Sequence, residues 1–155
     1  MSGDWGLGGL GTGDYGELPS TGYVSEPGGG GSVKSYEDLR VWRLGVDLTE
    51  AVYRATGGVP DHEQFGLTSQ LRRAAVSVPS NIAEGWGRGS RADYRRFVLQ
   101  ARGSLYEVET QLAIARRLDY LNDRIADALR TDTQALSRQL HALVRALDSP
   151  SPQSP

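Results

Sequence analysis

Apolar residues recur every three or four positions along four long segments of this chain. Such spacing places them on one face of a helix, so each segment is predicted to form an amphipathic α-helix. The predicted helices cover residues 35–56, 62–84, 91–118 and 123–147. No β-strand pattern competes with them, and the connections between them are short. The chain is therefore predicted to be all-α, an antiparallel up-down four-helix bundle.

Residues that favour helix ends mark the boundaries of these segments. A short polar side chain at a helix start accepts hydrogen bonds from free backbone N–H groups, and a partner three residues on reaches back. The predicted pairs are Ser35 with Asp38, Asp61 with Gln64, and Ser90 with Asp93, and Asn122 caps the last helix. Gly57 and Gly58 end the first helix, and Pro60 prevents its continuation.

The first helix carries two neighbouring apolar stripes, whereas the others carry one main stripe each. One stripe contains Leu39, Trp42, Val46 and Tyr53, and the other contains Val41, Leu44, Leu48 and Ala51. Either this helix buries a wide face in its own bundle, or it touches both its bundle and another subunit. The third helix is predicted to bury Tyr94, Phe97, Val98, Leu105, Val108, Leu112 and Ala115, and the fourth Ile125, Leu129, Leu136, Leu140, Leu143 and Leu147.

Pro79 falls inside the apolar stripe of the second helix. A proline has no N–H for the carbonyl four residues back, and its ring displaces that carbonyl, so the helix is predicted to bend there. The alternative is a helix that ends near Pro79 and is followed by a second short one. Gly85 is predicted to stop the helix.

Polar residues after Pro79 have structural interpretations. Asn81 is predicted to bond carbonyls that the proline frees, and Glu84 to pair with Arg88 one turn later. Gly103 and Ser104, in the third helix, are predicted to mark a close approach between helices.

The N-terminal segment differs from the rest of the chain in composition. Residues 1–32 hold twelve of the 20 glycines and four acidic residues but no Lys or Arg. We therefore divide the chain into a Gly-rich acidic tail and linker (1–34), a four-helix domain (35–148) and a Ser/Pro tail (149–155). A segment so poor in apolar residues is predicted to be flexible when alone. Its dispersed apolar residues are candidates for docking a partner, namely Trp5, Leu7, Leu10, Tyr15, Leu18 and Tyr23.

Arginines concentrate around the junction of the second and third helices. Seven lie between residues 72 and 102 against two acidic residues, a net charge of +5. Such a surface neutralises phosphates and binds nucleic acid in a salt-dependent manner. The candidates are Arg72, Arg73, Arg88, Arg91, Arg95 and Arg96. The alternative is a solvated face whose arginines pair with acidic residues, including Glu107 and Glu109.

The sequence contains no residue pattern typical of a catalytic or cofactor-binding site. There is no cysteine, and no Glu-x-x-His pair of the kind that holds di-iron centres in bundles. His62 and His141 have no second ligand at metal-binding spacing, so no metal, no cofactor and no enzymatic activity are predicted. No signal peptide or membrane-length apolar run occurs, which makes a cytoplasmic protein with no membrane association the expectation.

Three stretches resemble the bacterial four helix bundle protein family. They are QLRRAAVSVPSNIAEG at residues 70–85, RGSRADYRRF at 88–97 and ARGSLYEVETQL at 101–112, and the resemblance runs over residues 36–147. The family includes proteins encoded in intervening sequences of 23S rRNA genes, called S23-like, and the accessory variability protein of diversity-generating retroelements. The resemblance implies a ring-like homopentamer and, in the retroelement branch, binding of nucleic acid. This domain is less basic than that branch, and its Gly-rich extension is unlike the family's short start.

Two functions follow. The first is a non-enzymatic oligomeric accessory protein that binds nucleic acid, with RNA or an RNA/DNA hybrid as the partner, through its arginine-rich helical surface. The second is a homopentameric scaffold or adaptor whose N-terminal tail docks a protein partner, with many weak contacts combined through avidity.

Overall fold

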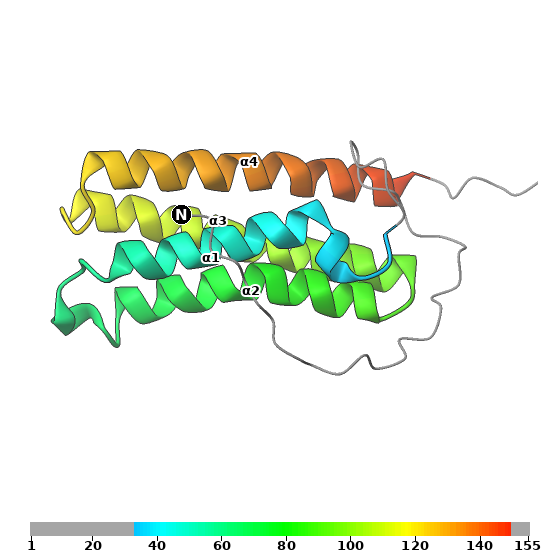
Figure 1. The fold of residues 1–155 in the computed structure, drawn as a ribbon, viewed down its shortest axis with the longest axis horizontal. Coiled ribbons are helices and arrows are strands. Elements are labelled where there is room, and N and C mark those ends of the chain that lie inside the picture. The colour runs from blue at the N-terminus through cyan, green and yellow to red at the C-terminus, as the bar shows by residue number, and fades with distance from the viewer. Residues whose placement is uncertain (1–32, 150–155) are drawn as a thin grey trace, which may run out of the picture.

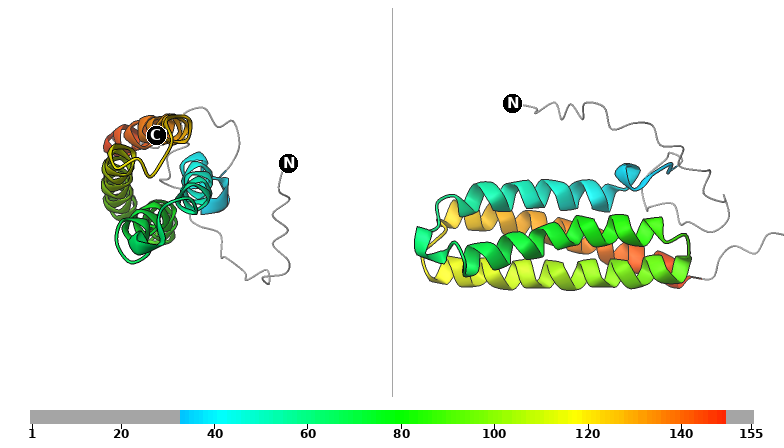
Figure 2. Two further views of the ribbon diagram at one scale, coloured as in Figure 1. Left: turned by 90° about the vertical axis from the view of Figure 1, so that its left-hand side faces the viewer. Right: turned by 90° about the horizontal axis from the view of Figure 1, so that it is seen from below.

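The computed structural model describes residues 33–149, and these form a four-helix bundle (Figure 1). A short 3-10 helix, Tyr36–Asp38, precedes α1 (Arg40–Thr56), and another, Asp61–Glu63, precedes α2 (Leu67–Gly87). Two longer helices follow, α3 (Arg91–Arg117) and α4 (Asp123–Asp148). Successive helices are neighbours in the end-on view of Figure 2 and run antiparallel in Figure 1, and no strand occurs within these residues. The prediction of an all-α, up-down four-helix bundle is confirmed.

Two of the predicted helix starts are confirmed, since Ser90 accepts from the N–H of Asp93 and Asn122 accepts from the N–H of Ile125. Ser35 and Asp38 form the predicted capping box, but it caps the 3-10 turn Tyr36–Asp38, and α1 begins only at Arg40, without a side-chain cap. The prediction for the second helix was wrong, because residues 61–63 form a separate 3-10 turn and α2 begins at Leu67. Glu63 caps it instead, accepting the Leu67 N–H at 3.0 Å. The tail residues singled out above lie outside the described residues.

The core fills the space between all four helices and explains the two stripes of α1. One face of α1 is buried, with Val41, Gly45, Leu48 and Val52 directed inward. Trp42 and Val46 are only half-buried, and Tyr53 is 45% exposed. Of the stripe that contains Leu39, Trp42, Val46 and Tyr53, only Leu39 is buried, and the rest lies towards the outside of the bundle. The largest fully buried side chains on the other helices include Leu71, Ile82, Tyr94, Leu105, Leu136, Leu140 and Leu143.

Helix α2 continues without interruption across Pro79, so the alternative of two shorter helices is wrong. The ring packs on α1, where a Cβ on Gly45 would lie 3.2 Å from the Pro79 Cβ. Pro79 leaves the Ala75 carbonyl without a helical N–H donor. The Thr49 hydroxyl of α1 donates to this carbonyl at 3.0 Å. The packing of α1 on α2 thus compensates the proline, and the predicted bend stays a prediction.

Asn81 has a different role from the one predicted. Its amide donates to the carbonyl and the hydroxyl of Ser77, at 2.8 Å and 2.9 Å, and not to the Ala75 carbonyl. The Ser77 hydroxyl in turn lies 2.8 Å from that of Ser104 on α3. These half-buried hydrogen bonds join α2 to α3. Asn81 does not reach the Ala75 carbonyl, because that carbonyl faces α1 on the other side of the helix.

The close approach of α2 and α3 occurs at Gly85, not at Gly103. A Cβ on Gly85 would lie 2.5 Å from the Phe97 Cβ, whereas a Cβ on Gly103 would meet nothing within 4 Å. Gly85 does not stop the helix either, since α2 runs on to Gly87. Sequence alone did not distinguish a glycine at a helix contact from one on the solvent side.

The seam between α1 and α4 brings two acidic residues together. Partial burial, followed by the negative charge of Asp47, raises the pKa of Asp132 above its ordinary value of 3.8. A raised pKa means that the folded state disfavours the ionised carboxylate, so this group costs stability at neutral pH and the cost falls as pH drops through its folded-state pKa.

Asp132→Asn is therefore expected to raise the thermal midpoint at pH 7. The gain stays below about 1 kcal/mol, because Asp132 is exposed and water screens its charge. It should shrink as pH falls through the raised pKa and vanish below 3.8, where the native carboxyl is protonated in both states. Asp127→Asn is the matched control, because Asp127 pairs with Arg116 at 2.8 Å. Removing the Asp127 charge therefore relieves no repulsion, and the thermal midpoint should not rise. Equal melting curves for Asp132→Asn and the native protein at pH 7 would contradict the argument.

Candidate nucleic-acid interface

The six arginines predicted to bind nucleic acid fall into two separate groups. Arg72 and Arg73 lie early in α2, and the other four lie around the turn from α2 to α3. Arg72 and Arg88 are sixteen positions apart, about 24 Å along the axis of α2 at 1.5 Å per residue. The structure therefore does not bring all six into one surface.

Arg72 is engaged in holding α1 against α2. Its Nε donates to the Thr56 hydroxyl at 2.9 Å, and its guanidinium carbon lies 4.6 Å from the centre of the Tyr53 ring. A cation over an aromatic face is attracted by the electrons of the ring. Arg73 is exposed and forms no ion pair within residues 33–149.

Arg88 and Arg96 both lie close to the ring of the buried Phe97. Arg88 pairs with Glu84 at 3.0 Å, as predicted, and its guanidinium lies 5.2 Å from the Phe97 ring centre. Arg96 pairs with Asp93 at 3.3 Å and lies 4.8 Å from the same ring centre. Both arginines remain largely exposed, so their charges still contribute to the electrostatic field of this end of the bundle.

Arg91 and Arg95 tie the start of α3 to the end of α4. Arg91 donates to the carbonyl oxygens of Ala146, Leu147 and Ser149 at 2.6, 3.2 and 2.7 Å, and Arg95 pairs with Asp148. The last carbonyls of a helix lack partners of their own and carry partial negative charge, so a guanidinium stabilises them. Five of the six predicted arginines thus have intramolecular partners, none of them Glu107 or Glu109.

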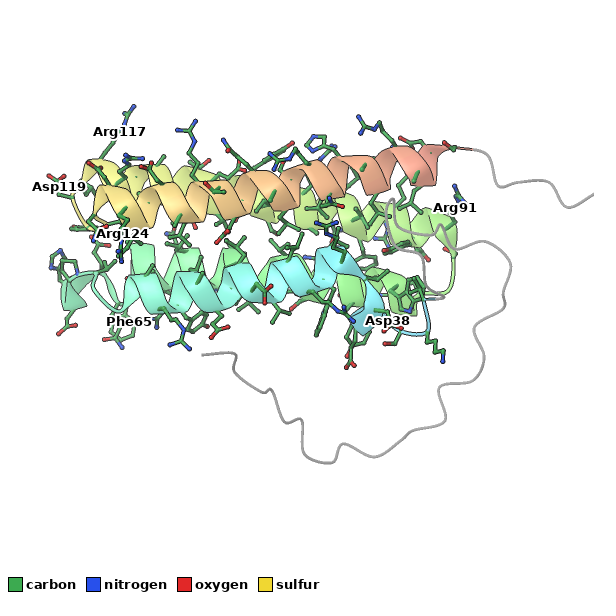
Figure 3. All side chains as sticks on the ribbon, turned by 45° about the horizontal axis from the view of Figure 1, so that its top comes forward. Asp38, Phe65, Arg91, Arg117, Asp119 and Arg124 are labelled. Atoms are coloured by element: carbon green, nitrogen blue, oxygen red, sulfur yellow. The ribbon has the colours of Figure 1, made fainter. Side chains whose placement is uncertain are left out.

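Further arginines on α3 and α4 lie outside the six candidates. Arg102 belongs to the cluster between residues 72 and 102 but was not among the candidates, and Arg138 and Arg145 were missed; none of the three forms an ion pair within residues 33–149. Arg138 and Arg145 are seven residues apart on α4, a spacing that places them on one helical face and was the signal for them in the sequence. Figure 3 shows Arg117 and Arg124 at the opposite end of the bundle from Arg91.

The excess positive charge of the bundle resides in its second half. Residues 33–90 hold seven basic and seven acidic residues, whereas residues 91–149 hold ten arginines and eight acidic residues. No acidic residue occurs between Asp132 and Asp148, or between Asp93 and Glu107. The halves of α3 and α4 that pack against each other near Arg91 therefore carry the most positive part of the described surface.

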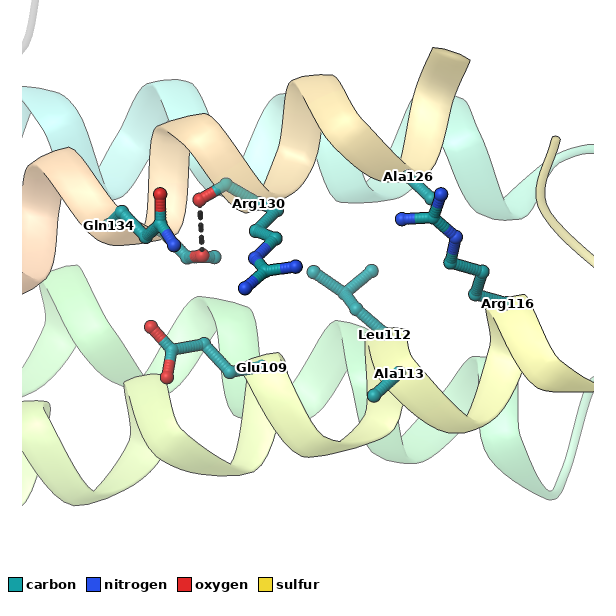
Figure 4. A pocket seen from close by; sticks show the side chains of 8 residues that line it. Glu109, Leu112, Ala113, Arg116, Ala126, Arg130 and Gln134 are labelled. Carbon is teal, nitrogen blue, oxygen red and sulfur yellow. Dashed lines mark hydrogen bonds between the residues drawn. The ribbon is translucent and has the colours of Figure 1, made fainter. Parts of the chain in front are cut away.

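A pocket of about 410 Å³ lies further along the groove between α3 and α4 (Figure 4). Leu112 and Ala126 give it apolar walls, and Glu109, Arg130 and Gln134 supply polar groups. The pocket holds no pair of groups arranged as nucleophile and base. Within the described residues, no cluster of three or more potential metal ligands occurs, and no helix is both long and apolar enough to cross a bilayer.

The described residues define an all-α four-helix bundle with an arginine-rich face on α3 and α4. The chain belongs to the family of 23S rRNA-intervening sequence proteins, whose family model matches residues 37–142. A solved structure from the S23 ribosomal protein family of Bacteroides thetaiotaomicron, described as having unknown function, shares the fold with a TM-score of 0.63. The two sequences are 20% identical, and the match covers 68% of this chain and 98% of the other. No curated protein matches the chain.

Proposed function

We propose that this protein is a non-enzymatic, oligomeric accessory protein that binds nucleic acid, with RNA as the preferred class. The observation that carries the proposal is the set of unpaired arginines on α3 and α4, where the excess positive charge of the domain resides. Exposed arginines without carboxylate partners release counterions from nucleic-acid phosphates when they bind. The name of the family, which refers to an intervening sequence of 23S rRNA, supports RNA as the ligand class.

Self-association is part of the proposal, and two exposed apolar patches support it. The first patch, the α1–α2 strip, contains Trp42, Val46, Tyr53 and Val76. The second lies at one end of the bundle, where Phe65 is 92% exposed and Leu118 is 52% exposed. A closed ring needs two different, complementary faces on each subunit. Two separate patches meet that requirement, and we propose the homopentamer that the family resemblance implies.

The α1–α2 strip supports assembly and is therefore equally compatible with the second candidate function, a homopentameric scaffold. In that case the ring presents several copies of the N-terminal tail, and the tails dock a protein partner. Several weak tail contacts on one ring gain strength from high effective concentration. The two candidates share the assembly and differ in whether the arginine face or the tail makes the functional contact.

Light scattering in line with size exclusion separates these candidates, with absorbance recorded at 260 and 280 nm. We expect a mass near five times 16.8 kDa and, for the untreated protein, an excess of 260 nm absorbance that high salt removes, because phosphate contacts weaken steeply with salt. A pentamer that never carries or binds nucleic acid would shift the assignment to the scaffold. A monomer would contradict the assembly common to both.

A further inference from the structure

Tyr106 of α3 and His141 of α4 form an aromatic pair that bridges these two helices, with Tyr106 exposed and His141 half-buried. The Tyr106 hydroxyl lies 3.3 Å from His141 Nε2, and the two ring centres are 6.5 Å apart. His141 Nδ1 lies 2.8 Å from the Ser137 carbonyl, which orients the imidazole on α4. Tyr106 nevertheless remains 43% exposed. A large aromatic ring is thus held in a fixed position while much of it faces solvent.

Three of the arginines without an ion pair, Arg102, Arg138 and Arg145, lie near this pair in sequence. Arg102 precedes Tyr106 by four residues on α3, and on α4 Arg138 and Arg145 lie three residues before and four residues after His141. Residues three or four apart on a helix are neighbours on its surface, with Cβ atoms about 5–6 Å apart. All three arginines therefore lie within about one helical turn of Tyr106 or His141.

Two acidic residues lie near Tyr106, and neither cancels this charge. Glu107 is adjacent in sequence and lines a shallow hollow on α3 together with Tyr106. Glu109 lines the pocket between α3 and α4 together with Arg130 (Figure 4). Three arginines against Glu107 and Glu109 leave the surroundings of Tyr106 with a net positive charge.

We propose that the Tyr106–His141 pair, with Arg102, Arg138 and Arg145, binds single-stranded RNA by stacking one unpaired base on the Tyr106 ring. The arginines contact the phosphates on either side of that base. An exposed aromatic ring with arginines one helical turn away combines the base-stacking and phosphate-binding groups by which proteins bind single strands. A base within a duplex is already stacked and paired, so its face is inaccessible to a side chain. This inference rests on the proposed function and names its ligand class and its site.

A purely structural role for the pair makes a different prediction. If Tyr106 only bridged α3 to α4, its hydroxyl would matter and its ring would not. Tyr106→Phe removes the hydroxyl and keeps the ring, whereas Tyr106→Ala removes both. Stacking predicts that Phe retains RNA binding and Ala does not.

The test is fluorescence anisotropy of the full-length protein with a labelled oligoadenylate, with a blunt RNA duplex of equal length and with the corresponding single-stranded DNA. We expect the native protein to prefer the single strands, and DNA to show whether the 2′-hydroxyl contributes. Tyr106→Ala should weaken single-strand binding about tenfold, within the range for one stacked base, and leave duplex binding unchanged. Tyr106→Phe should bind like the native protein.

The phosphate contacts are tested with a double variant, Arg138→Ala with Arg145→Ala. It should lower the slope of log affinity against log salt by about 1.4, since each single-strand phosphate contact contributes about 0.7. Arg54→Ala is the matched control, because Arg54 is exposed on α1 and paired with Glu50. Circular dichroism melting shows that each variant is folded.

The failures of the two proposals are distinguishable. A native protein that binds none of the three probes at low salt overturns the nucleic-acid function and this inference with it. A native protein that binds RNA, but with equal affinity for duplex or with no loss in Tyr106→Ala, overturns the stacking site and leaves the proposed function standing.

Discussion

Replacing Gly85 by alanine is expected to destabilise the bundle by about 2–3 kcal/mol, as overpacking a core does. The added Cβ would lie 2.5 Å from the Cβ and 3.2 Å from the Cγ of Phe97 on α3. The Phe97 Cβ is attached directly to the backbone, so no side-chain rotation relieves the contact. The helices must separate, which also disturbs the packing of Trp86 against Tyr94, whose rings are 5.7 Å apart.

Gly103→Ala is the matched control, since it makes the same chemical change in the interior of α3. A Cβ at Gly103 would meet nothing within 4 Å. Alanine favours a helix interior over glycine, so this variant is expected to gain about 0.5–1 kcal/mol. Urea unfolding followed by circular dichroism measures both changes. If Gly85→Ala were as stable as Gly103→Ala, the close contact of α2 with α3 would not exist in solution.

Thr49→Val is expected to cost about 1–3 kcal/mol, the penalty for a buried polar group left without a partner. The Thr49 hydroxyl donates to the Ala75 carbonyl at 3.0 Å, and Pro79 supplies no N–H to replace it. Valine has the same shape as threonine, so the change removes the hydrogen bond with little loss of packing. Urea unfolding at pH 7 measures the cost.

The cause is tested by repeating Thr49→Val in a Pro79→Ala background. Alanine at position 79 restores an N–H that donates to the Ala75 carbonyl, so the cost of losing the Thr49 hydroxyl should fall clearly below its value in the native background. A double-mutant cycle gives this coupling directly. Equal costs in the two backgrounds would show that Thr49 acts through its bond to the Gly45 carbonyl, at 2.8 Å, rather than through the proline.

The sequence by itself determined the four helices and most of their ends. Apolar spacing is a local property, and caps such as Ser35, Ser90 and Asn122 act on backbone groups within three residues. The exceptions were the starts of α1 and α2, because the residues predicted to open these helices form separate 3-10 turns, Tyr36–Asp38 and Asp61–Glu63. The spacing of apolar residues alone does not distinguish a short 3-10 turn from the first turn of the α-helix that follows it.

Only the tertiary structure decided which side chains have partners within the bundle and which remain free to contact a ligand. Arg91 and Arg102 look alike in sequence, but Arg91 bonds three carbonyls at the end of α4 and Arg102 does not. Gly85 and Gly103 look alike too, and only one of them lies against another helix. In each case the difference arises because a residue from a distant part of the chain lies beside one of the two residues and not beside the other. Periodicity gives the face of a helix, whereas the packing of four helices decides what that face meets.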